Sequence, residues 1–240
     1  MEVGLYTYLI GGLIFLPWWL ALFLWNKTLR DEMLTMSLLI GILAPLWAPF
    51  FFDYWTPVYL LPIEFGSVRI GSIEDFIYGF LVGGIASVVY ELAFPNKILK
   101  SRDRNHHWKW FFFPLVVIAA VSFHGLVFIG WNSIYASLVM FALLAIFICW
   151  YRHDLIFNAF MTGLLVLAIT FVGYLVWLAL FPNLIEAWWQ TERISGALFI
   201  GIPVEELAWA FALGLVGGPF YEFFMGIRFK KISLFVQKSH

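Results

Sequence analysis

Residues 74–91 read EDFIYGFLVGGIASVVYE, and residues 205–222 read EELAWAFALGLVGGPFYE. When the two segments are overlaid without gaps, both begin with an acidic pair and both end in Tyr-Glu. Phe80 then coincides with Phe211, and Gly83 coincides with Gly214. Apolar similarity between membrane helices is common by chance, but matched carboxylates at both ends are not. The two segments therefore indicate an internal repeat.

The repeat extends upstream of these segments. The turn Leu29-Arg30-Asp31-Glu32 resembles Tyr151-Arg152-His153-Asp154, and each turn opens an apolar run. A glycine follows each turn at the same distance, Gly41 in the first run and Gly163 in the second. The repeating unit therefore contains three apolar runs.

Composition places these runs in a lipid bilayer. The chain has 240 residues, of which 63% are hydrophobic and 12% are charged, and its mean hydropathy is +0.90. A soluble domain carries about 25% charged residues, so membrane lipid is the expected surrounding. A formal net charge of −1 argues against a nucleic-acid partner. The single Cys149 allows no internal disulfide.

A membrane-spanning helix needs about 20 mostly apolar residues, and the sequence offers about seven such runs. The first is interpreted as a retained helix, because no basic segment precedes it and no small-residue cleavage site follows it. In the last run, Gly217-Gly218-Pro219 predicts a kink or a wide turn. The runs are 4–25, 33–52, 72–93, 109–129, 131–150, 155–181 and 197–226.

Basic residues predict how these spans are oriented. With alternating spans, every lysine and arginine except Arg69 and Arg193 falls on one side. Basic loops favour the cytoplasm, so we expect a multi-pass protein of the cell membrane with an external N-terminus and a cytoplasmic C-terminus.

The predicted fold is an all-α integral membrane protein. Residues 1–93 form the first three-helix repeat, residues 94–130 form a basic loop and a connector helix, and residues 131–240 form the second repeat and a tail. Spans 1–3 and 5–7 run in the same directions, so the repeats are parallel and related by an axis along the membrane normal. The two acidic pairs should therefore lie at the same depth, near the external surface.

The acidic pairs are the candidate catalytic groups: Glu74 with Asp75, and Glu205 with Glu206. Carboxylates at a helix N-terminus can simply complement the helix dipole. Ionisable groups in or near a membrane span are costly, however, and tend to be functional. A carboxyl group in an apolar site can donate a proton, and two pairs at matched positions favour that interpretation.

Aromatic residues near the acidic pairs are candidates for substrate binding. Four-residue spacing predicts that Glu74 shares a helical face with Tyr78, and that Glu205 shares one with Trp209. Aromatic rings can stabilise a cation through their faces. The predicted substrate-binding residues are Asp53, Trp55, Tyr78, Trp209, Phe80 and Phe211.

The motif Pro203-Val204-Glu205-Glu206 and the stretch Asp53-Tyr54-Trp55 resemble the membrane-embedded, flavin-independent lycopene cyclase family. This type occurs in actinobacteria and archaea, and in fungi it is fused to phytoene synthase. Its marker is Pro-x-Glu-Glu/Asp, once per three-helix repeat. In the first repeat the chain departs from the marker, because Ser72-Ile73-Glu74-Asp75 has serine in place of proline.

The resemblance implies a carotenoid cyclase that converts the linear ends of lycopene into β-rings. A carboxylic acid would protonate the terminal double bond, the tertiary cation would close the ring, and a base would remove a proton. This intramolecular-lyase type of isomerisation has no net redox change, so we expect neither a cofactor nor a metal. The resemblance leaves open which carboxyl group is the acid, whether one or two rings form, and whether they are β or ε.

Other classes of membrane protein have sequence patterns that can be compared with these residues. The last span has no lysine for a retinal Schiff base, and the sequence has neither the aspartate-rich motifs of a prenyltransferase nor the Glu-Glu-x-x-x-Arg pattern of a glutamate-based membrane protease. Two alternatives stay open: a cyclase of an extended, prenylated carotenoid, and a small non-enzymatic transporter. A homo-oligomer is compatible with every one of these interpretations.

Overall fold

The computed structural model describes residues 1–240 except 67, 95–98, 103–108 and 231–240. Among the described residues, six helical runs are long and apolar enough to cross a membrane. A further apolar helix over Phe113–Phe128 is shorter. The prediction of an all-α membrane protein is therefore confirmed. The six runs are Thr7–Trp25, Lys27–Asp53, Ile73–Ala93, Ser133–Tyr151, His153–Leu180 and Val204–Met225.

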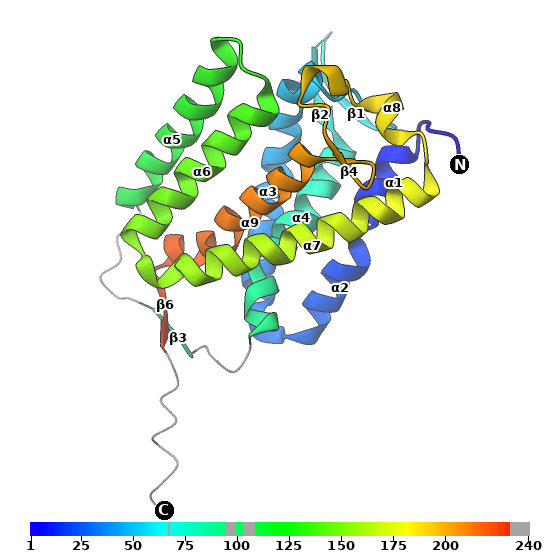
Figure 1. The fold of residues 1–240 in the computed structure, drawn as a ribbon. Helices are drawn as coiled ribbons and strands as arrows, with labels where there is room; N and C mark the ends of the chain where they lie inside the picture. The colour runs from blue at the N-terminus through cyan, green and yellow to red at the C-terminus, as the bar shows by residue number, and fades with distance from the viewer. Residues whose placement is uncertain (67, 95–98, 103–108, 231–240) are drawn as a thin grey trace, which may run out of the picture.

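The elements follow the predicted order of apolar runs (Figure 1). The helices are α1 (Thr7–Leu13), α2 (Leu16–Trp25), α3 (Arg30–Trp47), α4 (Ile73–Ala93), α5 (Lys109–Phe128), α6 (Ser133–Tyr151), α7 (Ile156–Leu180), α8 (Leu184–Trp188) and α9 (Val204–Met225). The strands are β1 (Pro62–Phe65), β2 (Val68–Ser72), β3 (Leu99–Arg102), β4 (Leu198–Phe199), β5 (Ile202–Pro203) and β6 (Ile227–Lys230). Short 3-10 helices cover Lys27–Leu29, Ala48–Asp53, His153–Leu155 and Thr191–Arg193.

The structure adds detail to three of the predicted spans. The first span consists of two helices, because α1 ends at Leu13 and α2 begins at Leu16. Pro17 lies in the first turn of α2, where proline is favoured. The last span begins at Val204 rather than at residue 197, because the preceding apolar residues form the β4–β5 hairpin. Of the kink or wide turn expected at Gly217-Gly218-Pro219, the wide turn is wrong, since α9 continues through Pro219.

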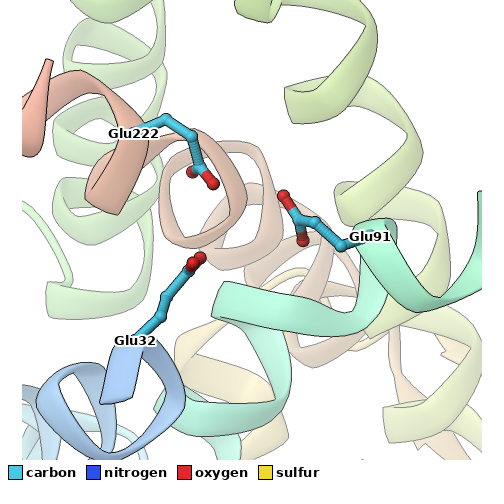
Figure 2. Close-up of side chains that lie close together, drawn as sticks. All are labelled: Glu32, Glu91 and Glu222. Atoms are coloured by element: carbon cyan, nitrogen blue, oxygen red, sulfur yellow. The ribbon is translucent and has the colours of Figure 1, made fainter. Parts of the chain in front are cut away.

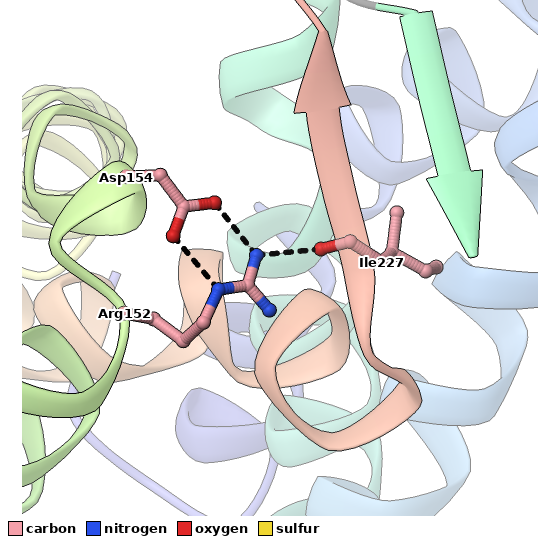
Figure 3. Close-up of polar contacts among 3 residues, drawn as sticks. All are labelled: Arg152, Asp154 and Ile227. Carbon is pink, nitrogen blue, oxygen red and sulfur yellow. Dashed lines mark hydrogen bonds and ion pairs between the residues drawn. The ribbon is translucent and has the colours of Figure 1, made fainter. Parts of the chain in front are cut away.

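The hairpins and α8 gather at one end of the helix bundle, and the β3–β6 pair lies at the other end (Figure 1). β3 pairs antiparallel with β6, so Lys100 and Arg228 lie in the same two-stranded sheet. Arg152 also reaches this sheet: its guanidinium donates to both carboxylate oxygens of Asp154 at 2.7 Å and to the Ile227 carbonyl at 2.7 Å (Figure 3). These basic residues therefore share one end of the molecule.

Small residues let two pairs of helices approach closely. A Cβ atom on Gly79 of α4 would lie 2.6 Å from Ala44 Cβ of α3. In the second half, a Cβ atom on Gly214 of α9 would lie 2.7 Å from the Cα of Gly163 in α7. Real side chains do not tolerate such distances, so glycine is required for α4 to pack on α3 and for α9 to pack on α7.

The end of the bundle that carries the hairpins is packed with aromatic side chains. Tyr8 from α1, Tyr174 and Trp177 from α7, and Trp188 from α8 are all buried there. Tyr8 meets Trp188 edge to face with ring centroids 6.3 Å apart, a geometry that aromatic pairs favour. This aromatic cluster surrounds the N-terminal ends of α4 and α9, where the acidic pairs lie.

Candidate functional site

Each acidic pair follows a β-hairpin directly. The β1–β2 hairpin ends at Ser72, and the β4–β5 hairpin ends at Pro203. The first helical residue donates its backbone N–H back to the residue before each hairpin, at 3.0 Å from Ile73 to Leu61 and at 3.1 Å from Val204 to Ala197. The hairpins thus place the carboxylates of both halves in the first turn of α4 and of α9.

The first carboxylate of each pair turns back to the chain that precedes its helix. Glu74 Oε1 accepts the backbone N–H groups of Leu60 at 2.6 Å and Leu61 at 3.1 Å. Glu205 Oε1 accepts the backbone N–H of Ser195 at 2.9 Å and the hydroxyl of Tyr135 at 2.9 Å. Both glutamates are buried. They fix the loops in front of the two helices.

The second carboxylate of the first pair faces a different set of partners. Asp75 is 3% exposed, and its Oδ1 accepts the Tyr8 hydroxyl at 2.7 Å. The hydroxyl of Ser72 donates to Asp75 Oδ2 at 2.8 Å and accepts the backbone N–H of Asp75 at 3.0 Å. Ser72 is therefore the N-cap of α4, and it also donates a hydrogen bond to the Asp75 carboxyl group.

Glu206, at the matching position in α9, accepts three side-chain hydrogen bonds. The Tyr54 hydroxyl at 3.1 Å and the Trp189 indole N–H at 3.0 Å donate to Oε1, and the Tyr174 hydroxyl at 2.9 Å donates to Oε2. Burial, and then the neighbouring Glu206 carboxylate, raises the pKa of Tyr54 well above its ordinary value. The phenol of Tyr54 therefore keeps its proton and remains a donor to Glu206.

Asp75 and Glu206 line one cavity between the two halves of the chain. Its volume is about 150 Å³ and its walls are mostly aromatic. A cavity of about 150 Å³ with apolar walls stays dry in another protein and binds a benzene molecule, so this one has room for a hydrocarbon group the size of one ring. Its aromatic walls include Tyr8, Tyr54, Trp55, Tyr78, Tyr174, Trp189 and Trp209.

Of the predicted binding residues, Trp55, Tyr78 and Trp209 line this cavity. The structure places the other predicted residues elsewhere. Asp53 accepts the backbone N–H of Ser133 at 2.7 Å and its hydroxyl at 2.6 Å, and so fixes the start of α6.

Phe80 and Phe211 pack between helices. Phe80 lies against Gly41 of α3, and Phe211 lies against Gly163 of α7. The expected sharing of faces also differs from the structure, because Tyr78 enters the cavity with Asp75, three positions away, instead of with Glu74.

No sequence pattern predicted Tyr8, Tyr174 or Trp189, which donate hydrogen bonds to the two cavity carboxylates. Each of them comes from a segment distant in sequence from its partner, and the chain has 10 Tyr and 13 Trp, so composition alone does not distinguish them. Ser72 was visible in the sequence as a departure from the motif. Because serine is a preferred N-cap residue, its place just before the apolar run was the signal that it caps α4.

A second group of carboxylates lies at the other end of α4 and α9. Glu32 of α3, Glu91 of α4 and Glu222 of α9 are buried, and one oxygen of each lies within 4.8 Å of the others. Figure 2 shows the three side chains converging from their separate helices. The helix ends of the two halves therefore meet on the side of the β3–β6 sheet.

The fold and the cavity define a class: a membrane protein in which helices enclose an aromatic cavity that is lined by two carboxyl groups, the buried Asp75 and the half-buried Glu206. Residues 132–224, which include α6, α7, Glu205 and Glu206, match the family model described as lycopene cyclase. This match supports a lycopene cyclase domain over residues 132–224, in agreement with the motif Pro203-Val204-Glu205-Glu206. The family supports a carotenoid cyclase that works on a carotenoid in a membrane. No curated protein and no solved structure matches the chain.

Proposed function

We propose that this chain converts the linear ends of lycopene into β-rings by acid–base chemistry. The observation that carries the proposal is the placement of Asp75 and Glu206, one from each half, on the same aromatic cavity. Ring closure needs a proton donor and a proton acceptor around one hydrocarbon end group. Two carboxyl groups in different surroundings suit these two roles.

The chemistry balances without any other reactant. One carboxyl group gives a proton to the terminal carbon–carbon double bond and leaves a tertiary cation. The next double bond attacks that cation, a carbon–carbon bond closes the ring, and the positive charge moves to a ring carbon. A carboxylate then takes a proton from the ring. The product is an isomer of the substrate, and the protein has gained one proton and lost one.

The aromatic walls support this chemistry in two ways. The rings of Tyr8, Trp55 and Trp189 lie close together, with centroids 5.2 Å apart for Tyr8 and Trp55 and 5.9 Å apart for Trp55 and Trp189. Aromatic faces stabilise a nearby cation by about 0.5–2 kcal/mol each. The same walls exclude water, which would otherwise capture the cation.

In the proposed architecture, residues 1–93 and 131–226 are parallel repeats, joined by a connector that includes α5. Matched contacts support this division. Gly41 lies against Phe80 in the first half, and Gly163 lies against Phe211 in the second. Phe80 and Phe211 coincide in the overlay of residues 74–91 with residues 205–222, and the two glycines follow their turns at the same distance. We place the hairpins outside the cell membrane and the β3–β6 sheet in the cytoplasm.

Expression in bacteria that accumulate lycopene tests the proposal. Chromatography of the pigments should show cyclic carotenoid with the natural chain and unchanged lycopene with an Asp75→Asn, Glu206→Gln double variant at equal protein level. Glu186→Gln, an exposed carboxylate on α8, is the matched control and should cyclise normally.

Other results separate the alternatives. Unchanged lycopene with the natural chain, together with a cyclic product in a host that makes a prenylated carotenoid, would indicate the extended-substrate cyclase. Uptake of a labelled polar solute without any cyclic product would indicate a transporter. Full cyclisation by the double variant would remove the cavity from the mechanism.

A further inference from the structure

We infer that the two halves have divided the chemistry: Asp75 is the proton donor, Glu206 is the base, and Ser72 and Trp189 position them. This inference rests on the proposed function and assigns the roles that the family resemblance leaves open. Its basis is the kind of hydrogen-bonding group that surrounds each carboxyl group, together with the serine that stands at position 72 where the other motif has Pro203.

The partners of Asp75 are compatible with a protonated carboxyl group. Tyr8 contacts Oδ1 at 2.7 Å and Ser72 contacts Oδ2 at 2.8 Å, both through hydroxyl groups. A hydroxyl group donates one hydrogen bond and also accepts. When Asp75 carries a proton, either hydroxyl can therefore accept it, and the contact is kept in both protonation states.

The partners of Glu206 favour an acceptor. Its Oε1 takes the Trp189 indole N–H at 3.0 Å and the Tyr54 hydroxyl at 3.1 Å. An indole N–H donates only, so a proton on Oε1 would oppose Trp189 directly. Tyr174 donates its hydroxyl to Oε2 at 2.9 Å, and because a hydroxyl can also accept, Oε2 is the oxygen that can hold a proton after the base has taken it. Three donors directed at one carboxyl group stabilise its ionised form, which is the form that a base requires before it takes the proton of the ring.

The difference between the motifs accounts for this asymmetry. Ser72 and Pro203 coincide in the sequence overlay, each two residues before its first glutamate. Serine supplies a hydroxyl to the second carboxyl group, and proline has no side-chain donor. Pro203 ends the short β5 strand, and Glu206 obtains its partners from Tyr54, Tyr174 and Trp189 instead. The serine therefore marks the half that donates the proton.

The two roles predict different failures. Without the donor, the terminal double bond is never protonated and lycopene stays unchanged. Without the base, the cation still forms and then loses a proton from another carbon or captures water. The products would then be other ring isomers or an alcohol. Substrate consumption and product pattern thus report on separate groups.

The experiment compares Asp75→Asn with Glu206→Gln in the lycopene-accumulating host, at protein levels matched by immunoblot. Asp75→Asn should leave lycopene unreacted, with turnover lowered by about 10²–10⁴-fold. Glu206→Gln should consume lycopene and shift the products away from the β-ring. The opposite result, with Asp75→Asn giving altered products and Glu206→Gln unreacted lycopene, would overturn the assignment, as would normal product from both. A natural chain that forms no cyclic carotenoid would instead refute the proposed function.

Two positioning variants decide the remaining case, in which both substitutions are inert. Ser72→Ala should lower turnover and keep the ring pattern, whereas Trp189→Phe should change the ring pattern. A changed pattern in Ser72→Ala, or in neither variant, would overturn the inference. Ser122→Ala, which removes a hydroxyl bonded to Ile118 within α5, is the control for loss of a serine hydroxyl and should match the natural chain.

Discussion

Glu205 and Glu206 are neighbours in the sequence, but we expect Glu205→Gln to affect mainly stability and Glu206→Gln to affect mainly the reaction. Glu205 Oε1 accepts the backbone N–H of Ser195 and the hydroxyl of Tyr135, both at 2.9 Å. Hydrogen bonds to a charged group contribute about 1.5–3 kcal/mol, and those between neutral groups about 0.5–1.5 kcal/mol. Glu205→Gln should therefore cost about 1 kcal/mol per bond, or about 2 kcal/mol in total. A chain of this size loses about 2–4 °C of unfolding midpoint per kcal/mol, so we expect a fall of about 4–8 °C.

Glu206→Gln should instead impair the reaction more than the fold. The amide keeps an acceptor oxygen for Trp189 and Tyr54 but cannot take a proton from the ring. Loss of one acid–base group lowers the rate by about 10²–10⁴-fold, so formation of β-rings should fall by that factor. Glu205→Gln should keep turnover within about tenfold of the natural chain, which corresponds to about 1.4 kcal/mol in the barrier.

Both quantities can be measured on protein purified in detergent. Turnover comes from chromatography of lycopene and β-ring products, and the unfolding midpoint comes from the loss of soluble, monodisperse protein on heating. Glu205→Gln protein that is as heat-resistant as the natural chain but forms no β-rings would refute the reasoning, because Glu205 would then act in the chemistry rather than in the loop.

Three further predictions concern the orientation, the packing and the Glu206 site. Reporters fused after Arg102 and after Arg228 should both be cytoplasmic, and a reporter inserted at Gly66, in the turn between β1 and β2, should be external. Reporters after Arg102 and Arg228 that lie on different sides would contradict the pairing of β3 with β6. Gly214→Ala should lower the free energy of unfolding by about 1–3 kcal/mol, because its Cβ would clash with Gly163. In the control Gly125→Ala, the new Cβ meets nothing within 4 Å, so the variant should be neutral or stabilised by up to about 1 kcal/mol. Equal thermal midpoints for the two variants would disprove the close approach of α9 to α7. Tyr54→Phe removes one donor from Glu206 and should lower the formation of β-rings by about tenfold without loss of protein. Unchanged β-ring formation would show that Trp189 and Tyr174 are sufficient.

Hydropathy predicted the helices well, because each run is longer and more apolar than a soluble helix needs to be. It failed where an apolar segment is not helical. Leu198, Phe199 and Ile200 belong to a hairpin whose turn places Ile200 at φ 53° and Gly201 at φ 79°. A sliding average cannot separate such a turn from the helix that follows. Hydropathy also predicted the first span, Thr7–Trp25, without showing the break between α1 and α2 inside it.

The candidate site was only partly predictable, for a geometric reason. The overlay of the two halves identified the acidic pairs, but not which carboxylate of each pair faces the cavity. The four-residue rule assigned Tyr78 to Glu74, whereas three-residue neighbours also share a helical face, and the structure places Tyr78 with Asp75. The partners of Glu206 come from three separate segments of the chain, so only the fold could reveal them.

The hairpins explain how two similar acidic motifs can serve two purposes. In each half, the first glutamate is bonded to backbone that precedes the helix, and this contact sets the rotation of the helix at its first turn. That rotation directs the next residue, Asp75 or Glu206, toward the shared cavity. The second carboxyl group is therefore free to differ between the halves, both in length and in its partners. Two halves that meet at one cavity need only one donor and one base between them, so identical motifs would be redundant there. The serine at position 72 is the kind of local change that separates these roles while the anchoring glutamate stays in place.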